Sequence, residues 1–301
     1  MKILLTLITG FVLLTNTLAQ KTFEGTKTAA EAGDKVEQFW LGYMYQNGKQ
    51  TEVNKDVAIE WFTKSAEQDN EIAQYALGSM YFDGDGVEKD HLKGLHWFKK
   101  SAELGYAESQ FNLGLAYYWG DIIKRDDKLA FQWFEKAALQ DHKAAQYYTG
   151  VMLDFGYGVV EDREKAYSWY KKSADKGYAK SQHAIGSFYD AGLVVEMNKK
   201  TALEWFTKSA NQGYAMSQFN VGFMKYHGIG TESSPEEALF WYQKSALQNN
   251  AGAELNLGLM YYNGEGTEKD LELATYWINK AHKDGSADAK KALDSLDLWD
   301  K

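Results

Sequence analysis

The chain has 301 residues and a formal net charge of −9 at pH 7, with 33 Lys and Arg against 42 Asp and Glu. This acidic balance argues against nucleic-acid binding, which needs clustered Lys and Arg side chains to contact phosphates. The absence of cysteine excludes a disulfide framework, and a single proline favours a helical protein.

The first nineteen residues have the pattern of a signal peptide. Lys2 precedes an apolar run over residues 3–14, and the small residue Ala19 stands at cleavage distance from that run. The run is shorter than the ~20 residues that span a bilayer, and no stop-transfer segment follows. We therefore expect cleavage after Ala19, no membrane insertion afterwards, and a periplasmic or secreted product. Residues 20–34 are expected to form an N-terminal lead-in.

After residue 34, a tryptophan and a glycine each recur every 36 residues. The tryptophans are Trp61, Trp97, Trp133, Trp169, Trp205, Trp241 and Trp277, and the glycines are Gly42, Gly78, Gly114, Gly150, Gly186, Gly222 and Gly258. Seven copies without an insertion predict an all-α stack of repeats, in which each unit packs on its neighbours. The predicted repeats are 35–70, 71–106, 107–142, 143–178, 179–214, 215–250 and 251–286.

The second repeat illustrates the predicted unit. Apolar residues at helical spacing predict a first helix, helix A, over residues 71–82. Gly78 interrupts it at a cost of about 1 kcal/mol relative to alanine. Because all seven repeats accept that cost, we expect another backbone to approach closely at this glycine. The segment from Asp83 to Gly86 then ends the helix, and Gly84 recurs in every copy.

The second helix of each repeat, helix B, starts at a column of N-capping residues. The column reads Asn54, Asp90, Asp126, Asp162, Asn198, Ser234 and Asp270. Pro235 follows Ser234 at the first helical position, where a missing N–H costs nothing. Helix B ends at a column of residues that tolerate a left-handed conformation, namely Asp69, Gly105, Asp141, Gly177, Gly213, Asn249 and Gly285. Each repeat is thus predicted to be a helical hairpin.

This pattern resembles the Sel-1-like repeat (SLR) family. The resemblance is carried by Ala73-Gln74-Tyr75-Ala76-Leu77-Gly78 in helix A and Trp97-Phe98-Lys99-Lys100-Ser101-Ala102 in helix B, and it covers all seven units. The family implies a right-handed α-solenoid with helix A on the concave side and helix B outside. It also implies protein–protein scaffolding, often by exported bacterial proteins that meet host factors, envelope regulators or cognate toxins. One exported branch, linked to β-lactam binding, has two cysteines per repeat, and this chain has none.

One sector of helix A varies from copy to copy while the flanking columns stay constant. The column at residue 83, for example, reads Asn47, Asp83, Trp119, Phe155, Ala191, His227 and Asn263. Such variation is expected of a concave, sequence-specific surface, because buried aromatic side chains dominate interface energetics. The predicted partner-binding residues are Trp40, Tyr43, Trp119, Tyr148, Phe155, Phe223 and His227. In the alternative interpretation, these aromatic side chains only fill contacts between neighbouring repeats.

Other aromatic columns have different predicted roles. The regular column of Phe62, Phe98, Phe134, Tyr170, Phe206 and Tyr242 is predicted to form the core. Phe240 and Tyr276 replace polar residues on helix B and predict a second patch on the convex side near the C-terminus.

Catalytic, metal and cofactor sites are not predicted. Ser173-Ala174-Asp175-Lys176 matches the Ser-x-x-Lys motif of penicillin-recognising enzymes, but no companion motif accompanies it and Ser173 lies in a column of Ser or Ala. The loop from Asp83 to Asp90 lacks the ligand spacing of a calcium loop. The six histidines show no metal spacing, and His183 is expected to be structural because its column is largely aromatic. An envelope enzyme acting on β-lactams or peptidoglycan remains the alternative to a protein-binding scaffold.

Residues 287–301 are predicted to form a capping helix and tail. Ala289, Leu293, Leu296, Leu298 and Trp299 would cover the last layer of the stack. We expect a monomer that binds a protein partner, and self-assembly through the terminal units is a further alternative.

Overall fold

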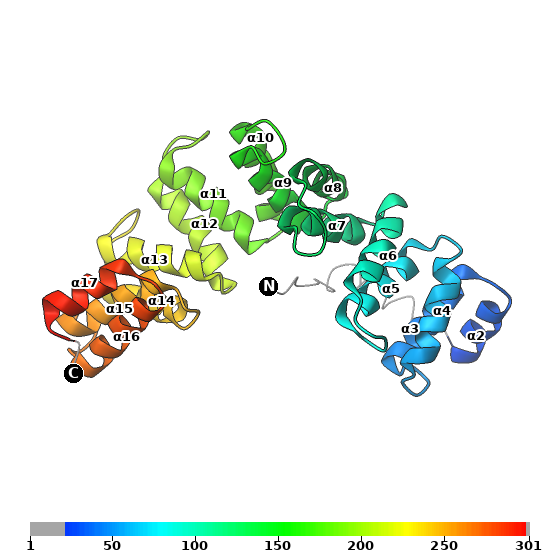
Figure 1. Ribbon diagram of the computed structural model, residues 1–301. Coiled ribbons are helices and arrows are strands. Elements are labelled where there is room, and N and C mark those ends of the chain that lie inside the picture. Colours follow the sequence, from blue (N-terminus) through cyan, green and yellow to red (C-terminus); the bar gives the residue numbers. More distant parts are fainter. Residues whose placement is uncertain (1–21, 299–301) are drawn as a thin grey trace. The chain divides into compact units, whose positions relative to one another are not determined.

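The computed structural model describes residues 22–298 (Figure 1). These residues form sixteen helices and no strand, so the fold is the predicted all-α solenoid of repeats. The predicted signal peptide and Trp299 lie outside the described residues.

Helix A begins every 36 residues without a departure from the period. These helices are α3 (Lys35–Asn47), α5 (Glu71–Asp83), α7 (Ala107–Trp119), α9 (Lys143–Phe155), α11 (Ala179–Ala191), α13 (Ala215–His227) and α15 (Ala251–Asn263). Helix B is α4 (Lys55–Ala66), α6 (His91–Glu103), α8 (Asp127–Leu139), α10 (Arg163–Asp175), α12 (Lys199–Asn211), α14 (Pro235–Ala246) and α16 (Leu271–Lys283). Helix α2 (Phe23–Glu31) precedes the first repeat and α17 (Ala287–Leu296) follows the last one. Helix α5 ends one residue later than predicted.

Helix ends follow the sequence closely. Each predicted N-cap of helix B accepts a hydrogen bond from a backbone N–H three residues on; Lys93 N donates to Asp90 Oδ1 at 2.9 Å, for example. The predicted closing column has positive φ throughout, from 55° at Asp69 to 104° at Gly105. Pro235 occupies the start of α14, as expected. Local chemistry therefore sets the register of the helical hairpins.

The recurring glycine of helix A makes room for a side chain of helix B, which is an aromatic ring at Gly78 and Ile278 at Gly258. A Cβ atom at Gly78 would lie 2.5 Å from Cδ1 of Phe98 and 3.1 Å from the carbonyl oxygen of Gly94. The predicted backbone approach is present, but the aromatic ring is the closer neighbour. The Phe62 ring meets Gly42 in the same way, so helices A and B of these repeats pack as a close pair.

The core is built from the predicted aromatic column. Phe62, Phe98, Phe134, Tyr170, Phe206 and Tyr242 are all buried, which confirms their assignment to the core. Most of the helix B tryptophans are only partly buried, whereas Trp241 is buried, and several of them pack against the core of the preceding repeat. Trp97 packs against the cluster that contains Phe62 and Leu77, and Trp133 packs against the cluster that contains Phe98. These tryptophans join successive repeats.

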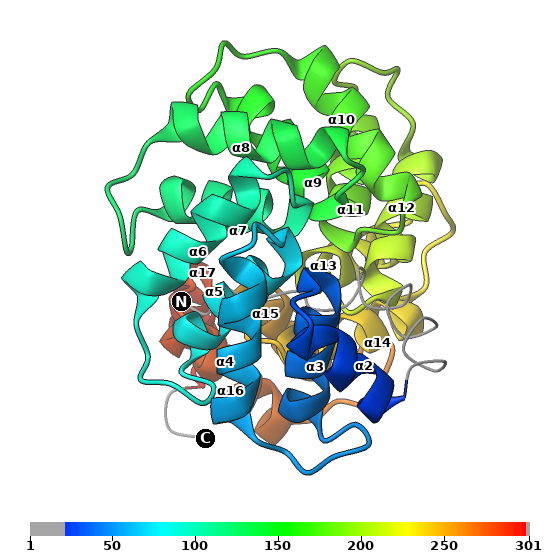
Figure 2. The ribbon, with the colours of Figure 1, turned by 90° about the vertical axis from the view of Figure 1, so that its right-hand side faces the viewer.

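The chain divides into two compact parts between Glu161 and Asp162. The N-terminal part holds α2 to α9, and the C-terminal part holds α10 to α17. In the N-terminal part, helices that follow one another in sequence lie side by side, with α2 outermost beside α3 (Figures 1 and 2). In the C-terminal part, α17 packs on α16, and Ala289, Leu293 and Leu298 are buried with Ile278. The two flanking helices thus contact the first and last helices of the repeats.

Candidate functional site

The predicted partner-binding residues divide into exposed and buried groups. Trp119, Phe155 and Phe223 are 40%, 59% and 39% exposed, which is high for large apolar side chains, and His227 is also exposed. Trp119, Phe155 and His227 are the last residues of their A helices. This position carries them away from the packed middle of the helix, which explains their exposure.

Trp40 and Tyr43, by contrast, are buried, with 5% and 8% exposure. Both belong to the core cluster of the first two repeats, where the Trp40 ring lies 5.3 Å from Phe39 and 5.8 Å from Tyr43. At Trp40, the variability of the column therefore reflects packing in the core. Tyr43 also lines a hollow, which is described below.

Aromatic contacts bring together some of the predicted residues of the N-terminal part. The Tyr118 ring lies 4.9 Å from Trp119 and 5.7 Å from Tyr148, so it joins the two. Tyr148 is half-buried and stacks on Phe134 at 5.0 Å. Phe155 stacks instead on Tyr157 at 5.7 Å. In the C-terminal part, the rings of Phe223 and His227 are 4.3 Å apart.

A hollow of about 740 Å³, which we call the N-terminal hollow, opens on the A helices of the first three repeats. It lies over α3, α5 and the start of α7. Its lining residues are Phe39, Tyr43, Gln46, Asn47, Lys55, Phe62, Ile72, Tyr75, Ala76, Ser79, Met80, Asp83, Gly84, Asp85, Tyr106 and Glu108. The lining combines aromatic rings with three carboxylates and one lysine. Asp83 belongs to a variable column of helix A, but none of the three carboxylates is among the predicted partner-binding residues.

The single lysine of the N-terminal hollow is already paired. Lys55 donates a hydrogen bond to Asp85, and Gln46 Nε2 donates to Asp85 Oδ2 at 3.2 Å. These bonds, with Lys55 the largest cause, hold the pKa of Asp85 below its usual value. Burial raises the pKa of both Asp83 and Glu108. The hollow thus has two further carboxylates whose charge its own lysine does not balance.

A smaller hollow of about 320 Å³, the C-terminal hollow, occupies the equivalent place in repeats five and six. It is lined by Asp190, Lys199, Phe206, Phe219, Asn220, Phe223, Met224 and Ile229. Each of these residues lies four periods of 36 after a lining residue of the N-terminal hollow; Lys199 corresponds to Lys55, and Phe223 to Ser79. Lys199 Nζ donates a hydrogen bond to Asp190 Oδ1 at 2.8 Å.

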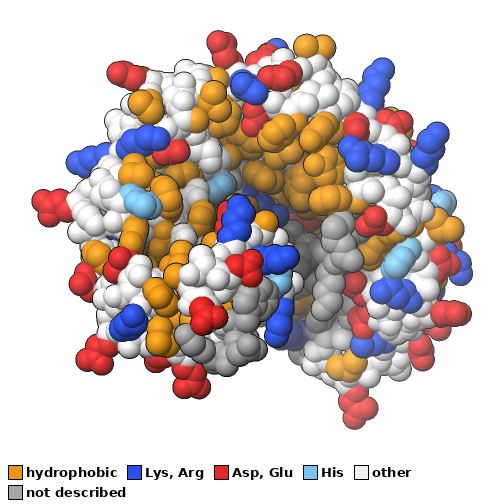
Figure 3. Space-filling view, turned by 60° about the vertical axis from the view of Figure 1, so that its left-hand side comes forward, with side chains coloured by type: hydrophobic (Ala, Val, Ile, Leu, Met, Phe, Trp, Pro, Cys, Tyr) orange, Lys and Arg blue, Asp and Glu red, His pale blue; other side chains and the backbone are white. Residues whose placement is uncertain are grey.

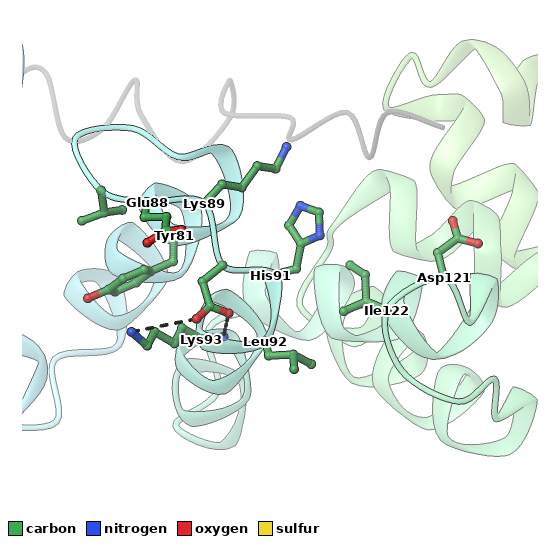
Figure 4. Close-up of a pocket in the computed structure, with 10 residues that line it drawn as sticks. Tyr81, Glu88, Lys89, His91, Leu92, Lys93, Asp121 and Ile122 are labelled. Carbon is green, nitrogen blue, oxygen red and sulfur yellow. Dashed lines mark hydrogen bonds and ion pairs between the residues drawn. The ribbon is translucent and has the colours of Figure 1, made fainter.

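A third depression, of about 690 Å³, lies between the loop before α6 and the loop after α7 (Figure 4). Its lining has charges of both signs, and Lys93 is held by the N-cap Asp90 at 3.9 Å. Figure 4 shows Lys89, Lys93 and Asp121 pointing in different directions. Because its polar groups do not converge, this depression has the character of a solvated surface.

The structure also places the residues considered for chemistry. Ser173 is buried and accepts a hydrogen bond from Ser181 Oγ at 2.7 Å, so its hydroxyl is a packing element between helices. His183 Nδ1 lies 2.9 Å from Ser217 Oγ, and its ring is 5.2 Å from Phe206, which confirms a structural role. Within residues 22–298, no three His, Asp or Glu side chains are grouped as metal ligands, and no helix there is long and apolar enough to cross a membrane.

Exposed apolar side chains also occur on helix B. Phe240 and Tyr276 are exposed, as the predicted second patch requires, and Lys244 Nζ lies 4.3 Å from the Phe240 ring centroid. Apolar patches lie between interspersed acidic and basic side chains on the face shown in Figure 3.

Comparison with known proteins places this geometry in context. The family model described as Sel1 repeat matches residues 38–70, 72–106, 107–142, 143–178, 179–214, 215–250 and 251–286. The chain is 32% identical to c5321, described as a protective antigen of uropathogenic Escherichia coli with an SLR fold; the match covers 92% of this chain and 67% of that one, with a TM-score of 0.72. It is 31% identical to a Sel1 repeat protein from Oxalobacter formigenes, over 91% of this chain and 79% of that one, with a TM-score of 0.73. A search of the curated proteins found no match.

Proposed function

The chain belongs to the Sel1 repeat family, and on that premise we propose that it binds a protein partner through the exposed face of its A helices. Sel1 repeat solenoids are protein–protein interaction scaffolds and are in general not enzymes. The observation that carries the proposal is the exposure of Trp119, Phe155 and Phe223 on A helices, and Phe223 also lines the C-terminal hollow. Large apolar side chains exposed together are typical of interaction surfaces.

Each compact part has its own share of this surface. In the N-terminal part the surface consists of the hollow over α3, α5 and α7 and of Trp119, Tyr148 and Phe155. In the C-terminal part it consists of the smaller hollow with Phe223 and the adjacent His227. We propose export to the periplasm or beyond, with a role as an envelope regulator, an adaptor, a host-factor binder or a toxin-neutralising immunity protein.

Affinity capture with a matched surface control tests this function. The purified chain is used to capture partners from envelope extracts, which are identified by mass spectrometry. Trp119→Ala with Phe155→Ala should lose the partner, because both changes remove exposed apolar area at the ends of A helices. Helical circular dichroism and the melting temperature should change little, since neither side chain is buried.

The control is Phe240→Ala with Tyr276→Ala, which removes two exposed aromatic side chains from B helices. This control should keep the partner. Loss of capture in the control, with full capture by the Trp119 and Phe155 variant, would place the interface on the B helices and contradict the proposal.

A further inference from the structure

We propose that the N-terminal hollow receives an arginine side chain of the partner protein. The inference rests on the proposed function and specifies the chemistry that one part of the surface recognises. It is carried by the shape of the hollow, by its tyrosine rings and by its excess of carboxylates.

The volume suits a side chain together with its flanking peptide. At about 740 Å³ the hollow falls within the range of roughly 300–1,000 Å³ found for ligand sites in proteins. It stays open because helix α5 presents Ala76 and Ser79 toward it, two small residues in columns that hold larger side chains elsewhere in the chain.

Tyrosine rings form part of the wall. Tyr75 and Tyr106 lie with their ring centroids 5.1 Å apart, and Tyr75 is backed by Phe98 at 5.5 Å. Such contacts fix the orientation of the rings, and aromatic faces attract a cation that is placed over them. The planar guanidinium group of arginine can stack on a ring while it donates hydrogen bonds at its edge.

The charge of the lining is complementary to a cation. Lys55 is engaged by Asp85, which leaves Asp83 and Glu108 as the carboxylates in excess over lysine within the lining. Nε2 of His142 lies 3.7 Å from Oε1 of Glu108, while Nδ1 of that ring accepts a hydrogen bond from Ala145 N. Lys89 and His91, which do not line the hollow, act electrostatically on Asp83 without a hydrogen bond to it. An incoming arginine would therefore meet acceptors that have no hydrogen-bonded lysine or arginine partner in the hollow.

Both carboxylates act on the same wall of the hollow. Burial raises the pKa of Tyr75 to about 12, and the negative charges of Glu108 and Asp83 add to this effect. The two carboxylates thus lie within electrostatic range of one tyrosine, although Asp83 ends α5 and Glu108 is in the first turn of α7. A single cationic group beside Tyr75 would feel the negative potential of both.

A pair of neutral and charged peptides tests the inference. The probes are acetyl-Gly-Arg-Gly-amide and its citrulline analogue, which keeps the shape of arginine but has no charge. In NMR titrations of the full chain, the arginine peptide should bind at least roughly tenfold more tightly than the citrulline peptide, with shifts at Tyr75 and Tyr106. Equal affinity of the two peptides would overturn the inference.

The matched variants separate this site from general electrostatics. Asp83→Asn with Glu108→Gln should weaken binding of the arginine peptide at least roughly tenfold. Glu232→Gln with Glu236→Gln changes the net charge equally at exposed sites outside the hollow and should leave binding unchanged. Unchanged binding in the Asp83 and Glu108 variant, at unchanged circular dichroism, would also overturn the inference.

Capture of the natural partner distinguishes the two proposals. If the Asp83 and Glu108 variant retains the partner while the Trp119 and Phe155 variant loses it, the arginine site is wrong and the proposed function stands. If both variants retain the partner, the proposed surface is wrong as well.

Discussion

The N-terminal and C-terminal hollows are built from the same columns of the repeat but differ more than twofold in volume, about 740 Å³ against 320 Å³. Helix length does not account for this difference in volume, because the A helices of both regions start and end at equivalent residues. The side chains do account for it, because Ala76 and Ser79 in the first region correspond to the larger Asn220 and Phe223 in the second. In this solenoid, a regular frame carries surfaces whose shape is set by two or three residues.

The polar groups of the two hollows differ in the same way. Lys55 reaches forward to Asp85 in the next repeat, whereas Lys199 bonds Asp190 within its own repeat. At the place of Asp85 the C-terminal hollow has Ile229, and it has no lining carboxylate in place of Asp83 or Glu108. The first hollow is thus open and acidic, and the second is small and apolar apart from one ion pair and Asn220.

Exchanging residues between the hollows should have the largest effect. In Ser79→Phe, the new ring should occupy the N-terminal hollow as Phe223 occupies the other, so that measurable binding of the arginine peptide is lost. The melting temperature should not fall, because the same column accommodates Tyr43, Leu115 and Phe223. Peptide titration and thermal unfolding monitored by circular dichroism measure both quantities.

The reverse change, Phe223→Ser, is the control for the exchange. It should enlarge the C-terminal hollow without creating an arginine site, because the carboxylates are missing there. Since the ring is partly exposed, the free energy of unfolding should fall by only about 1–2 kcal/mol. If Ser79→Phe bound the arginine peptide as the parent does, the side chain at this column would not determine whether the hollow is open to the peptide.

The sequence was sufficient to predict the repeat frame but not the hollows. The N-caps such as Asp90, the closing glycines such as Gly105 and the buried ring of Phe98 depend on local chemistry that repeats in every copy. The open hollow depends on which columns face one another across repeats. Ser79 lines the hollow together with Tyr43 of the preceding repeat and Glu108 of the following one, and a single repeat does not reveal that neighbourhood.

The same limitation explains why the predicted binding residues include both exposed and buried side chains. Column variability identified Trp119 and Phe155, which are exposed, but it also selected Trp40, which is buried. Variation between repeats arises both where a side chain is exposed and where its buried neighbours differ, as they do for Trp40 in the first repeat. Asp83 lies in the variable column but was not selected with its aromatic members, and Glu108 was missed, because no spacing rule links the end of one A helix with the start of the next.

A smaller difference between the two regions is expected in how acid changes the free energy of unfolding. His183 lies against Phe206 of the C-terminal hollow, where the N-terminal hollow has Phe39 against Phe62. Burial lowers the pKa of His183 from 6.5 to about 4. In the unfolded chain, His183 is therefore protonated as the pH falls below 6.5, whereas in the folded chain it is protonated only near pH 4. Stability from this residue is present above pH 6.5 and is lost as the pH falls toward 4.

His183→Phe, which places the aromatic residue of that column at this position, should remove this loss. The difference in unfolding free energy between pH 7 and pH 4.5 should shrink by about 2 kcal/mol relative to the parent. Urea unfolding at the two pH values measures it, and His227→Phe, at an exposed histidine, serves as the control. An equal acid dependence in parent and His183→Phe would show that this histidine does not resist protonation.

The smallest effects should come from the two lysines that border the hollows. Lys55→Met and Lys199→Met each remove an ion pair between partly exposed groups, which is worth less than about 1 kcal/mol. The two changes should nevertheless differ in one readout. Since Lys55 is the largest cause of the lowered pKa of Asp85, Lys55→Met should raise that pKa in an NMR titration, whereas Lys199→Met should leave it unchanged. If neither change moved the titration of Asp85, the ion pair that joins Lys55 of the first repeat to Asp85 of the second would not exist in solution.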